Sequence, residues 1–322
     1  MKNLWRYGVV WVLLVGMCVR GEEAKELTPP RGYKSRAELM SAAALGLVKL
    51  VNKDAVAPET VEVQKDVEYG KVGERALLLD LYKPKEKKAK PVPGLIFIHG
   101  GGWKAGSRKD YQVYTGYFAD RGYVAATISY RLSKEAPYPA AVEDAKCAVR
   151  WMRKNAASLG VDPEKIVAIG GSAGGHLSMM LGYSADEKKL EGNGGNNDVS
   201  SHVNAIVDLY GPYDLTTEFG QKQGVVKDFL LKTYDEAPEL WKEASPISHL
   251  KKGAPPTLIF HGTIDEIVPV EQSDALDKRL TELGVKHKYC RLEGWPHTMD
   301  AAVPVNEYCR GEILKFLGEV FP

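Results

Sequence analysis

Ser172 lies in a stretch of sequence that is typical of an activated nucleophile. The run Gly170-Gly171-Ser172-Ala173-Gly174 fits the pattern G-x-S-x-G and directly follows the apolar stretch 166–169. In this pattern the serine sits on a sharp turn between a buried strand and a helix, and the glycines leave room for backbone that passes close by. Ordinary loops rich in glycine and serine also match the pattern, so the assignment depends on partners elsewhere in the chain.

A glycine run upstream of this serine is suited to stabilising negative charge. The apolar residues 94–98 predict a buried strand, and His99-Gly100-Gly101-Gly102-Trp103 follows it directly. Acyl transfer needs N–H donors at the point where a carbonyl oxygen becomes an oxyanion. We expect the backbone amides of Gly101, Gly102 and Ala173 to be these donors. The alternative, a phosphate-binding loop, would need G-x-x-x-x-G-K-[ST] or G-x-G-x-x-G, and neither pattern occurs.

Two downstream residues are suited to activating the serine. Asp265 follows a predicted strand at 257–260, and His297 lies in a loop after a predicted strand at 288–292. A neutral imidazole at His297 can take the serine proton and return it to the leaving group, while Asp265 holds the ring in the required tautomer. Glu266 is an alternative to Asp265. The other histidines beside glycine turns are expected to hydrogen-bond to backbone instead: His99, His176 and His261.

The chain order Ser172, Asp265, His297 is the order found in α/β-hydrolases. The chain resembles that superfamily, and within it the esterase and lipase group typified by hormone-sensitive lipase and the bacterial feruloyl and acetyl esterases. The resemblance extends over about residues 67–321 and rests on the following motifs: His99–Trp103, Gly170–Gly175, Ser129–Leu132, Tyr138–Ala141 with Asp144, His261-Gly262-x-x-Asp265 and Pro296-His297. It implies no catalytic role for Arg131 or Asp144, which we interpret as a structural pair.

The resemblance implies a serine carboxylesterase that acts through an acyl-enzyme formed on Ser172. It further suggests short-acyl substrates, such as acetyl or feruloyl esters carried on carbohydrates. Two alternatives stay open from the sequence: an exopeptidase of the prolyl-oligopeptidase type, and a hydrolase-fold binding protein without catalytic activity. The latter would be expected to have a broken triad, whereas every triad residue type is present here.

The apolar segments predict an α/β fold. Buried strands are expected at 95–99, 124–130, 166–169, 205–210, 257–260 and 288–292, with helices at 140–157, 173–183, 271–283 and 306–317. This alternation is typical of a mostly parallel central sheet with helices on both faces. An earlier strand at 77–82 is expected to be an antiparallel edge strand. Residues 212–250 interrupt the alternation and predict a small helical insertion, a lid over the active site.

The N-terminus has the layout of a secretory signal peptide. Lys2 and Arg6 precede an apolar run at 9–19, which is shorter than the roughly 20 residues that span a bilayer. We therefore expect a signal peptide at 1–21, an N-terminal segment at 22–60, a hydrolase domain at 61–322, and export to the periplasm or the extracellular space. A lipoprotein signal ending at Cys18 is an alternative.

The composition of the chain agrees with a globular enzyme and does not suggest nucleic acid as a partner. A formal net charge of +1 and a hydrophobic content of 44% do not favour nucleic-acid binding. No cluster of cysteines and histidines has metal-ligand spacing, so we predict neither a metal nor a cofactor. The expected partner is a small-molecule or carbohydrate-linked ester, with no stable membrane span. Cys290 and Cys309 flank the His297 loop and fit either a disulfide or two free thiols.

Overall fold

The computed structural model describes residues 27–86 and 88–322. The expected signal peptide at 1–21, with Cys18, lies outside these residues. The N-terminal segment at 22–60 is described only from Leu27 onward.

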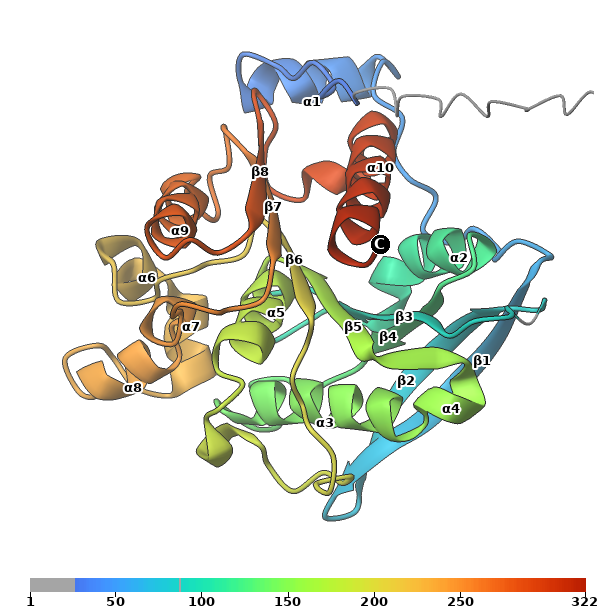
Figure 1. The fold of residues 1–322 in the computed structure, drawn as a ribbon. Coiled ribbons are helices and arrows are strands. Elements are labelled where there is room, and N and C mark those ends of the chain that lie inside the picture. The colour runs from blue at the N-terminus through green and yellow to red at the C-terminus, as the bar shows by residue number, and fades with distance from the viewer. Residues whose placement is uncertain (1–26, 87) are drawn as a thin grey trace, which may run out of the picture.

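A twisted sheet runs through the middle of the molecule (Figure 1). In the described residues its eight strands follow the order β1-β2-β4-β3-β5-β6-β7-β8. β1 and β2 are antiparallel to each other, β2 is antiparallel to β4, and the remaining neighbours pair in parallel. The strand bounds are β1 Val61–Val72, β2 Arg75–Pro84, β3 Val92–Ile98, β4 Val124–Ile128, β5 Val161–Gly171, β6 Ala205–Leu209, β7 Thr257–Gly262 and β8 His287–Leu292.

Helices cover both faces of the sheet (Figure 1). The main helices on one face are α3 Ala140–Lys154, α5 Ala173–Tyr183 and α9 Glu271–Glu282, and those on the other face are α2 Gln112–Asp120 and α10 Val303–Val320. Shorter helical elements are α1 Arg36–Ala44, α4 Ala156–Leu159, η1 Arg108–Tyr111, η2 Lys188–Leu190 and η4 Met299–Ala301. The predicted α/β-hydrolase arrangement of a mostly parallel sheet between two helical layers is confirmed.

Successive residues of the central strands alternate between the two helical layers. In β3, Ile96 and Ile98 pack in the core shared with α3, α5 and α9, whereas Leu95 and Phe97 pack in the core shared with α2 and α10. Successive side chains of a strand point to opposite faces of the sheet, so a strand buried on both faces must be apolar at every position. For this reason the central strands are recognisable in the sequence as continuous apolar runs.

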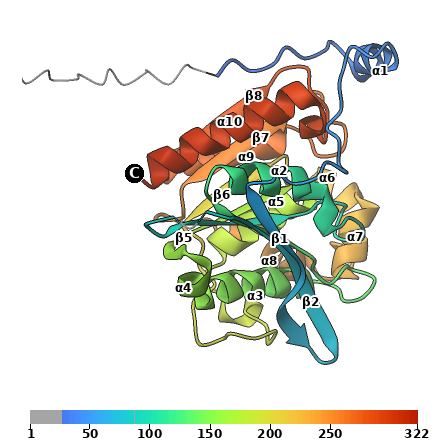
Figure 2. The ribbon, with the colours of Figure 1, turned by 90° about the vertical axis from the view of Figure 1, so that its right-hand side faces the viewer.

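The expectation that 77–82 forms an edge strand is wrong. These residues lie in β2, which is antiparallel as predicted but is covered by β1 on one side and β4 on the other. The sequence of β1 gives little sign of a strand, because most of its side chains are partly or fully exposed and its pairing with β2 is interrupted at two points. Figure 2 shows β1 and β2 as long strands that extend past α3.

The insertion at 212–250 is helical, as predicted. It contains α6 Glu218–Lys222, α7 Gly224–Leu230, α8 Pro238–Glu243 and η3 Pro246–Ser248. Several contacts attach it to the body of the protein, and two of them involve residues near Ser172. The ring of Phe229 stacks on Trp103 with a centroid distance of 4.5 Å, and the carbonyl of Ala244 lies 2.7 Å from Nε2 of His176.

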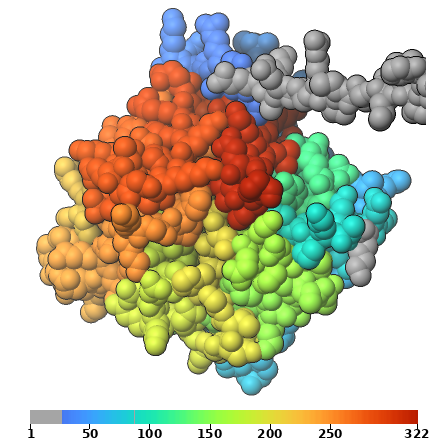
Figure 3. Space-filling view, viewed as in Figure 1, coloured from blue at the N-terminus to red at the C-terminus, as the bar shows by residue number. Residues whose placement is uncertain are grey.

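The N-terminal segment reaches the C-terminal part of the chain. Leu50 forms an isolated antiparallel bridge with Ala302, supported by hydrogen bonds from Val51 N to Ala301 O at 2.8 Å and from Val303 N to Lys49 O at 2.8 Å. Figure 3 shows this segment, in blue, on the outside of the molecule beside the orange and red C-terminal elements. The bridge places the segment next to the loop that follows His297.

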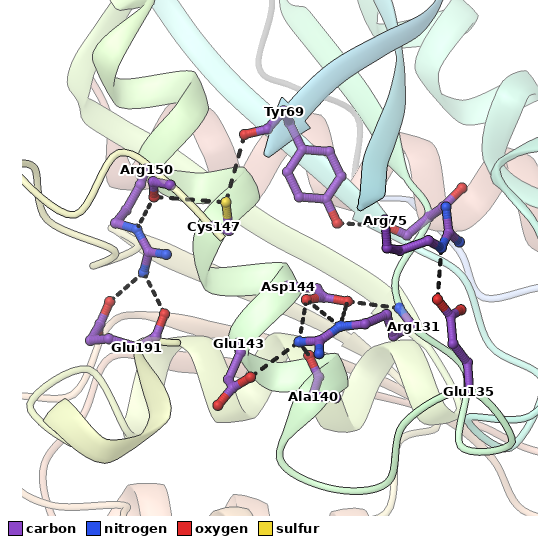
Figure 4. A network of polar contacts seen from close by, with 12 residues as sticks. Tyr69, Arg75, Arg131, Glu135, Ala140, Glu143, Asp144, Cys147, Arg150 and Glu191 are labelled. Atoms are coloured by element: carbon purple, nitrogen blue, oxygen red, sulfur yellow. Dashed lines mark hydrogen bonds and ion pairs between the residues drawn. The ribbon is translucent and has the colours of Figure 1, made fainter. Parts of the chain in front are cut away.

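The Gly/Asn-rich loop at 191–198 is tied to the fold at several points. The carboxylate of Glu191 pairs with two buried cations, Lys146 Nζ at 2.8 Å and Arg150 Nη1 at 2.6 Å. Figure 4 shows the contact with Arg150. The carbonyl of Gly194 accepts a hydrogen bond from Lys71 N at 2.8 Å. The glycine and asparagine content of the loop alone would predict a mobile segment, whereas these contacts hold it against α3 and β1.

Candidate active site

Ser172 occupies a strained turn between β5 and α5. Its φ of 56° and ψ of −121° lie outside the regions that ordinary residues prefer. The glycines explain how the turn is accommodated, since a Cβ at Gly170 would lie 2.3 Å from the carbonyl oxygen of Gly174, and a Cβ at Gly174 would lie 1.9 Å from that of Ile98. The turn places Ser172 at the carboxyl edge of the parallel strands and at the N-terminus of α5.

The structure brings Ser172, His297 and Asp265 together in one hydrogen-bonded chain. Nε2 of His297 lies 3.0 Å from Oγ of Ser172, and Nδ1 of His297 lies 2.6 Å from Oδ2 of Asp265. With Nδ1 protonated toward the carboxylate, Nε2 is free to accept the serine proton. The alternative acid, Glu266, is exposed and pairs with Arg36 at 3.0 Å.

The carboxylate of Asp265 is held in its ionised form. Burial favours the neutral form, but hydrogen bonds from His261 and His297, the charge of His297 and the amide of Val268 outweigh it and lower the pKa of Asp265 to about 2. Oδ1 accepts hydrogen bonds from Ile267 N at 2.8 Å and Val268 N at 2.9 Å. Both oxygens are therefore occupied by donors, which fixes the orientation of the carboxylate.

The glycine loop after β3 presents unpaired amides beside the serine. Gly101 and Gly102 have φ values of +106° and +59°, a backbone conformation that favours glycine. The amides of Gly101, Gly102 and Ala173 donate no hydrogen bond within residues 27–86 and 88–322, and all three residues line the same cavity as Ser172. This is the arrangement expected of donors that wait for an oxyanion.

The other histidines beside glycine turns make structural contacts, as predicted. Nδ1 of His99 lies 2.8 Å from the carbonyl of Gly100, and burial lowers the pKa of His99. Besides its contact with the Ala244 carbonyl, His176 accepts a hydrogen bond from Nε1 of Trp103 at 3.3 Å, and burial lowers the pKa of His176 to about 4. His261 has a further contact with the triad aspartate.

Arg131 and Asp144 form the structural pair that the sequence suggested. Nη2 of Arg131 lies 2.7 Å from Oδ1 of Asp144, Nε lies 3.0 Å from each carboxylate oxygen, and the backbone N of Arg131 donates to Oδ2 at 2.8 Å (Figure 4). The Asp144 side chain is buried, so this pair joins the loop after β4 to the N-terminal part of α3. Neither residue lines the cavity that contains Ser172.

The triad opens into a cavity of about 610 Å³. The glycine loop and the residue after Ser172 line it, together with residues of the insertion such as Phe219 and Val225. Sequence reasoning missed a further part of the wall, contributed by Leu50, Val51 and Lys53 of the N-terminal segment. No motif marks these residues; the bridge to Ala302 and the ion pair of Lys53 with Asp110 at 3.3 Å hold them here.

The cavity also contains a group of tyrosines that the sequence did not single out. Tyr111 and Tyr114 come from η1 and α2, and Tyr210 follows β6. The ring of Tyr210 lies edge-on to His297 with a centroid distance of 4.8 Å. Tyrosine is common in buried cores, and the sequence gives no reason to place these three residues together.

Three cysteines lie in the described residues. Cys147, Cys290 and Cys309 are free, buried thiols, and burial raises the pKa of each. No group of three or more potential ligand side chains in residues 27–86 and 88–322 is arranged to hold a metal ion. Across the same residues, no helix combines the length and apolar character needed to cross a bilayer.

The BD-FAE family profile matches residues 79–280, more than half of the chain. The chain belongs to this family. Esterase LipC of Mycobacterium tuberculosis is 35% identical to it over 233 residues, which cover 70% of this chain and 57% of LipC. Esterase LipQ of the same organism is 31% identical over 300 residues, which cover 91% of this chain and 70% of LipQ. The chain thus spans a little over half of LipC.

Solved structures agree with this membership. A truncated carbohydrate esterase from gut microbiota superimposes with a TM-score of 0.73 at 28% identity, covering 82% of this chain and 99% of that one. The apo form of Thermogutta terrifontis esterase 2 gives a TM-score of 0.71 at 33% identity, covering 84% of this chain and 98% of that one. This BD-FAE member therefore groups with carboxylic ester hydrolases of the α/β-hydrolase fold.

Proposed function

We propose that this protein is an exported serine carboxylesterase that hydrolyses short-acyl esters, including acetyl and feruloyl esters carried on carbohydrates. The observation that carries the proposal is the hydrogen-bonded chain from Ser172 through His297 to Asp265, which opens into a cavity with unpaired amides. The order and spacing of these three side chains, with the Asp265 carboxylate held ionised, support acyl transfer through Ser172.

The reaction starts when Oγ of Ser172 attacks the ester carbonyl carbon and its proton moves to Nε2 of His297. The carbonyl oxygen becomes an oxyanion that the amides of Gly101, Gly102 and Ala173 stabilise. Losing one such donor typically costs about 3–4 kcal/mol of transition-state stabilisation. The intermediate collapses when the C–O bond to the alcohol breaks and the departing oxygen takes the proton from Nε2.

Water then completes the cycle. It attacks the acyl-enzyme carbonyl and gives its proton to Nε2, and the second tetrahedral intermediate expels Oγ of Ser172, which recovers the proton. Asp265 stays ionised throughout, because its pKa of about 2 lies far below neutral pH, and it stabilises the imidazolium of His297 in both halves of the reaction. No step requires a group from outside the chain other than water and ester.

The substrate class is supported by the cavity and by one relative. The insertion at 212–250 narrows one side of the cavity with apolar residues, which favours a short or aromatic acyl group over a long chain. A solved relative is named a carbohydrate esterase, and export would bring the enzyme to polymers that cannot enter a cell. The domain limits of 61–322, with the insertion as a lid, belong to the same proposal.

The proposal is tested by ester hydrolysis with the purified full chain and its Ser172→Ala variant. The panel comprises p-nitrophenyl acetate, butyrate and octanoate, methyl ferulate and acetylated xylan. We expect turnover that falls with acyl length and decreases by several orders of magnitude in Ser172→Ala. Equal activity of the variant, or no turnover of any ester by a folded protein, would refute the esterase. N-terminal sequencing of protein recovered outside the cytoplasm tests export, and an intact N-terminus or purely cytoplasmic protein would contradict it.

A further inference from the structure

The cavity around Ser172 differs in character on its two sides. The insertion and the loop after β7 contribute mainly apolar residues to one side, with Gln223 as a polar one: Phe219, Val225, Val226, Ile267 and Val268. The other side, called the polar side here, is lined by hydroxyl groups and charges from the N-terminal segment, η1, α2, the end of β6 and η4, next to the apolar Leu50 and Val51: Lys53, Asp110, Tyr111, Tyr114, Tyr210 and Asp300. An ester consists of an acyl group and an alcohol group. A cavity with one apolar and one polar side can bind these two groups differently.

Two of the three tyrosine hydroxyls on the polar side already have partners. The hydroxyl of Tyr114 donates to Oδ2 of Asp300 at 3.2 Å, and that of Tyr210 donates to Oδ1 of the same carboxylate. The amide Nδ2 of Asn306 donates to the backbone carbonyl of Asp300 at 3.1 Å. These contacts fix Asp300 and both hydroxyls in place before any ligand binds.

Tyr111 is different. Its side chain is only 5% exposed, yet its hydroxyl makes no hydrogen bond to the part of the chain that the structure describes. A Cβ at Gly171, the residue before the serine, would lie 2.5 Å from the hydroxyl oxygen of Tyr111 and 2.9 Å from that of Tyr210. The free hydroxyl therefore lies close to the reacting centre. Burial raises the pKa of Tyr111 well above its usual value, so the hydroxyl keeps its proton and can donate it.

Tyr111 lines the cavity, so water can serve as the partner of its hydroxyl until a ligand binds. Packing alone would favour phenylalanine at this position. A ligand that displaces this water without offering a polar atom would leave the hydroxyl unpaired, at a cost in binding free energy. The substrate group that reaches Tyr111 should therefore be polar.

The chemistry of the triad decides which half of the ester lies on the polar side. The leaving oxygen must reach Nε2 of His297 to take up its proton. The polar side begins at His297, because Tyr210 contacts the imidazole ring and Asp300 follows three residues later. The apolar side begins at the oxyanion loop, where a Cβ at Gly102 would lie 2.6 Å from Cγ2 of Val225.

We propose that the polar side of the cavity is an alcohol subsite in which the Tyr111 hydroxyl binds a hydroxyl group of the leaving alcohol. This inference rests on the proposed esterase function and deepens it. The subsite selects esters of polyhydroxy alcohols, whether sugars or glycerol, over esters of the same acid with a plain alkyl alcohol. Tyr111 is then the specificity-determining residue for the alcohol, and the insertion shapes the acyl side.

The test compares three acetate esters on the wild type and on Tyr111→Phe. Propyl acetate has no further hydroxyl, glycerol 1-acetate has two, and a mono-acetylated xylobiose represents the sugars. We expect kcat/KM of the variant to fall about tenfold for a hydroxylated ester, the loss of one hydrogen bond, and to stay within twofold for propyl acetate. A loss confined to the sugar ester or to the glycerol ester identifies the source of the alcohol, and either result supports the subsite.

Tyr117→Phe is the matched control. Tyr117 lies on α2 like Tyr114 but does not line the cavity, so all three rates should remain at the wild-type level. Equal losses of Tyr111→Phe on all three esters would overturn the inference, since Tyr111 would then support the reaction in general. If Tyr111→Phe kept the wild-type kcat/KM on all three esters, the inference would be overturned as well. The esterase proposal is tested separately, and it fails if Ser172→Ala keeps the wild-type activity.

Discussion

His261 and Asp265 are in contact, with Nε2 of His261 3.2 Å from Oδ2 of Asp265 and both side chains fully buried. The same carboxylate oxygen lies 2.6 Å from Nδ1 of His297. Nε2 of His261 also lies 2.9 Å from the carbonyl of Val268, which can only accept, so the proton is on Nε2. Nδ1 of His261 lies 2.7 Å from Oγ of Ser273, which holds the ring from the other side.

His261 is therefore expected to position Asp265. In His261→Leu the carboxylate loses one donor, so Asp265 is held less firmly in the orientation that contacts His297. We expect kcat to fall about tenfold with KM unchanged. His261→Gln keeps an N–H donor and should recover most of the rate. A higher KM in His261→Leu, or no recovery of kcat in His261→Gln, would contradict the positioning role.

The oxyanion loop should tolerate no side chain at Gly102. A Cβ there would press on Cγ2 of Val225 at 2.6 Å, and the loop would have to shift its amides to relieve the contact. Gly102→Ala should lower kcat by about 10²–10³-fold, as the loss of one oxyanion donor does, without unfolding the protein. If the clash is the cause, the double variant Gly102→Ala/Val225→Ala recovers part of kcat. Val225→Ala alone serves as the control.

Asp265 should contribute to stability in a defined pH range. Its pKa is lowered from 3.8 to about 2 in the folded protein, so its ionised form stabilises the fold above pH 4, and this contribution is lost as the pH falls from about 4 to 2. The shift corresponds to about 2 kcal/mol. Urea unfolding of the wild type and of Asp265→Asn between pH 2 and 5 measures it: the stability difference between them should shrink toward pH 2. A stability difference that does not change with pH would rule out a stabilising contribution from ionised Asp265.

The cation pair under the Gly/Asn-rich loop should be sensitive to the carboxylate that pairs with both cations. Lys146 and Arg150 have side chains that are 0% and 1% exposed, and the Glu191 carboxylate pairs with each of them. Glu191→Ala leaves two buried cations without a carboxylate and should lower the free energy of unfolding by about 3 kcal/mol, with kcat unchanged at permissive temperature. Asp198→Ala, which breaks an exposed pair with Lys154, should change it by less than about 0.5 kcal/mol. Equal losses of unfolding free energy in the two variants would show that burial of the cations does not determine the size of the loss.

Most of the candidate triad could be predicted because its residues follow strands that are easy to recognise. Ser172 and Asp265 come at the ends of apolar runs, and parallel strands bring their carboxyl ends to one edge of the sheet. The glycines around Ser172 carry a second signal, since close backbone approach excludes any other residue there. His297 lies farther from its strand, and the chain order of the triad singled it out among the histidines.

The parts that were missed depend on contacts between segments far apart in the chain. β1 is half exposed and lacks the continuous apolar run of a central strand, so β2 was wrongly expected at the edge. The contact of His261 with Asp265 looked from the sequence like another turn histidine bound to backbone. Leu50 and Tyr111 carry no motif, and only tertiary packing brings them to the cavity.

The bridge between Leu50 and Ala302 joins two segments that lie far apart in the chain at the wall of the cavity. Asp265 and His297 also follow Ser172 in the chain, so the ribosome releases Ser172 before the residues that are proposed to activate it. On the proposed mechanism, the serine of a partly synthesised chain is inert. Removal of the residues from His297 onward would take α10 out of the core as well, and would therefore cost the fold together with the proposed base.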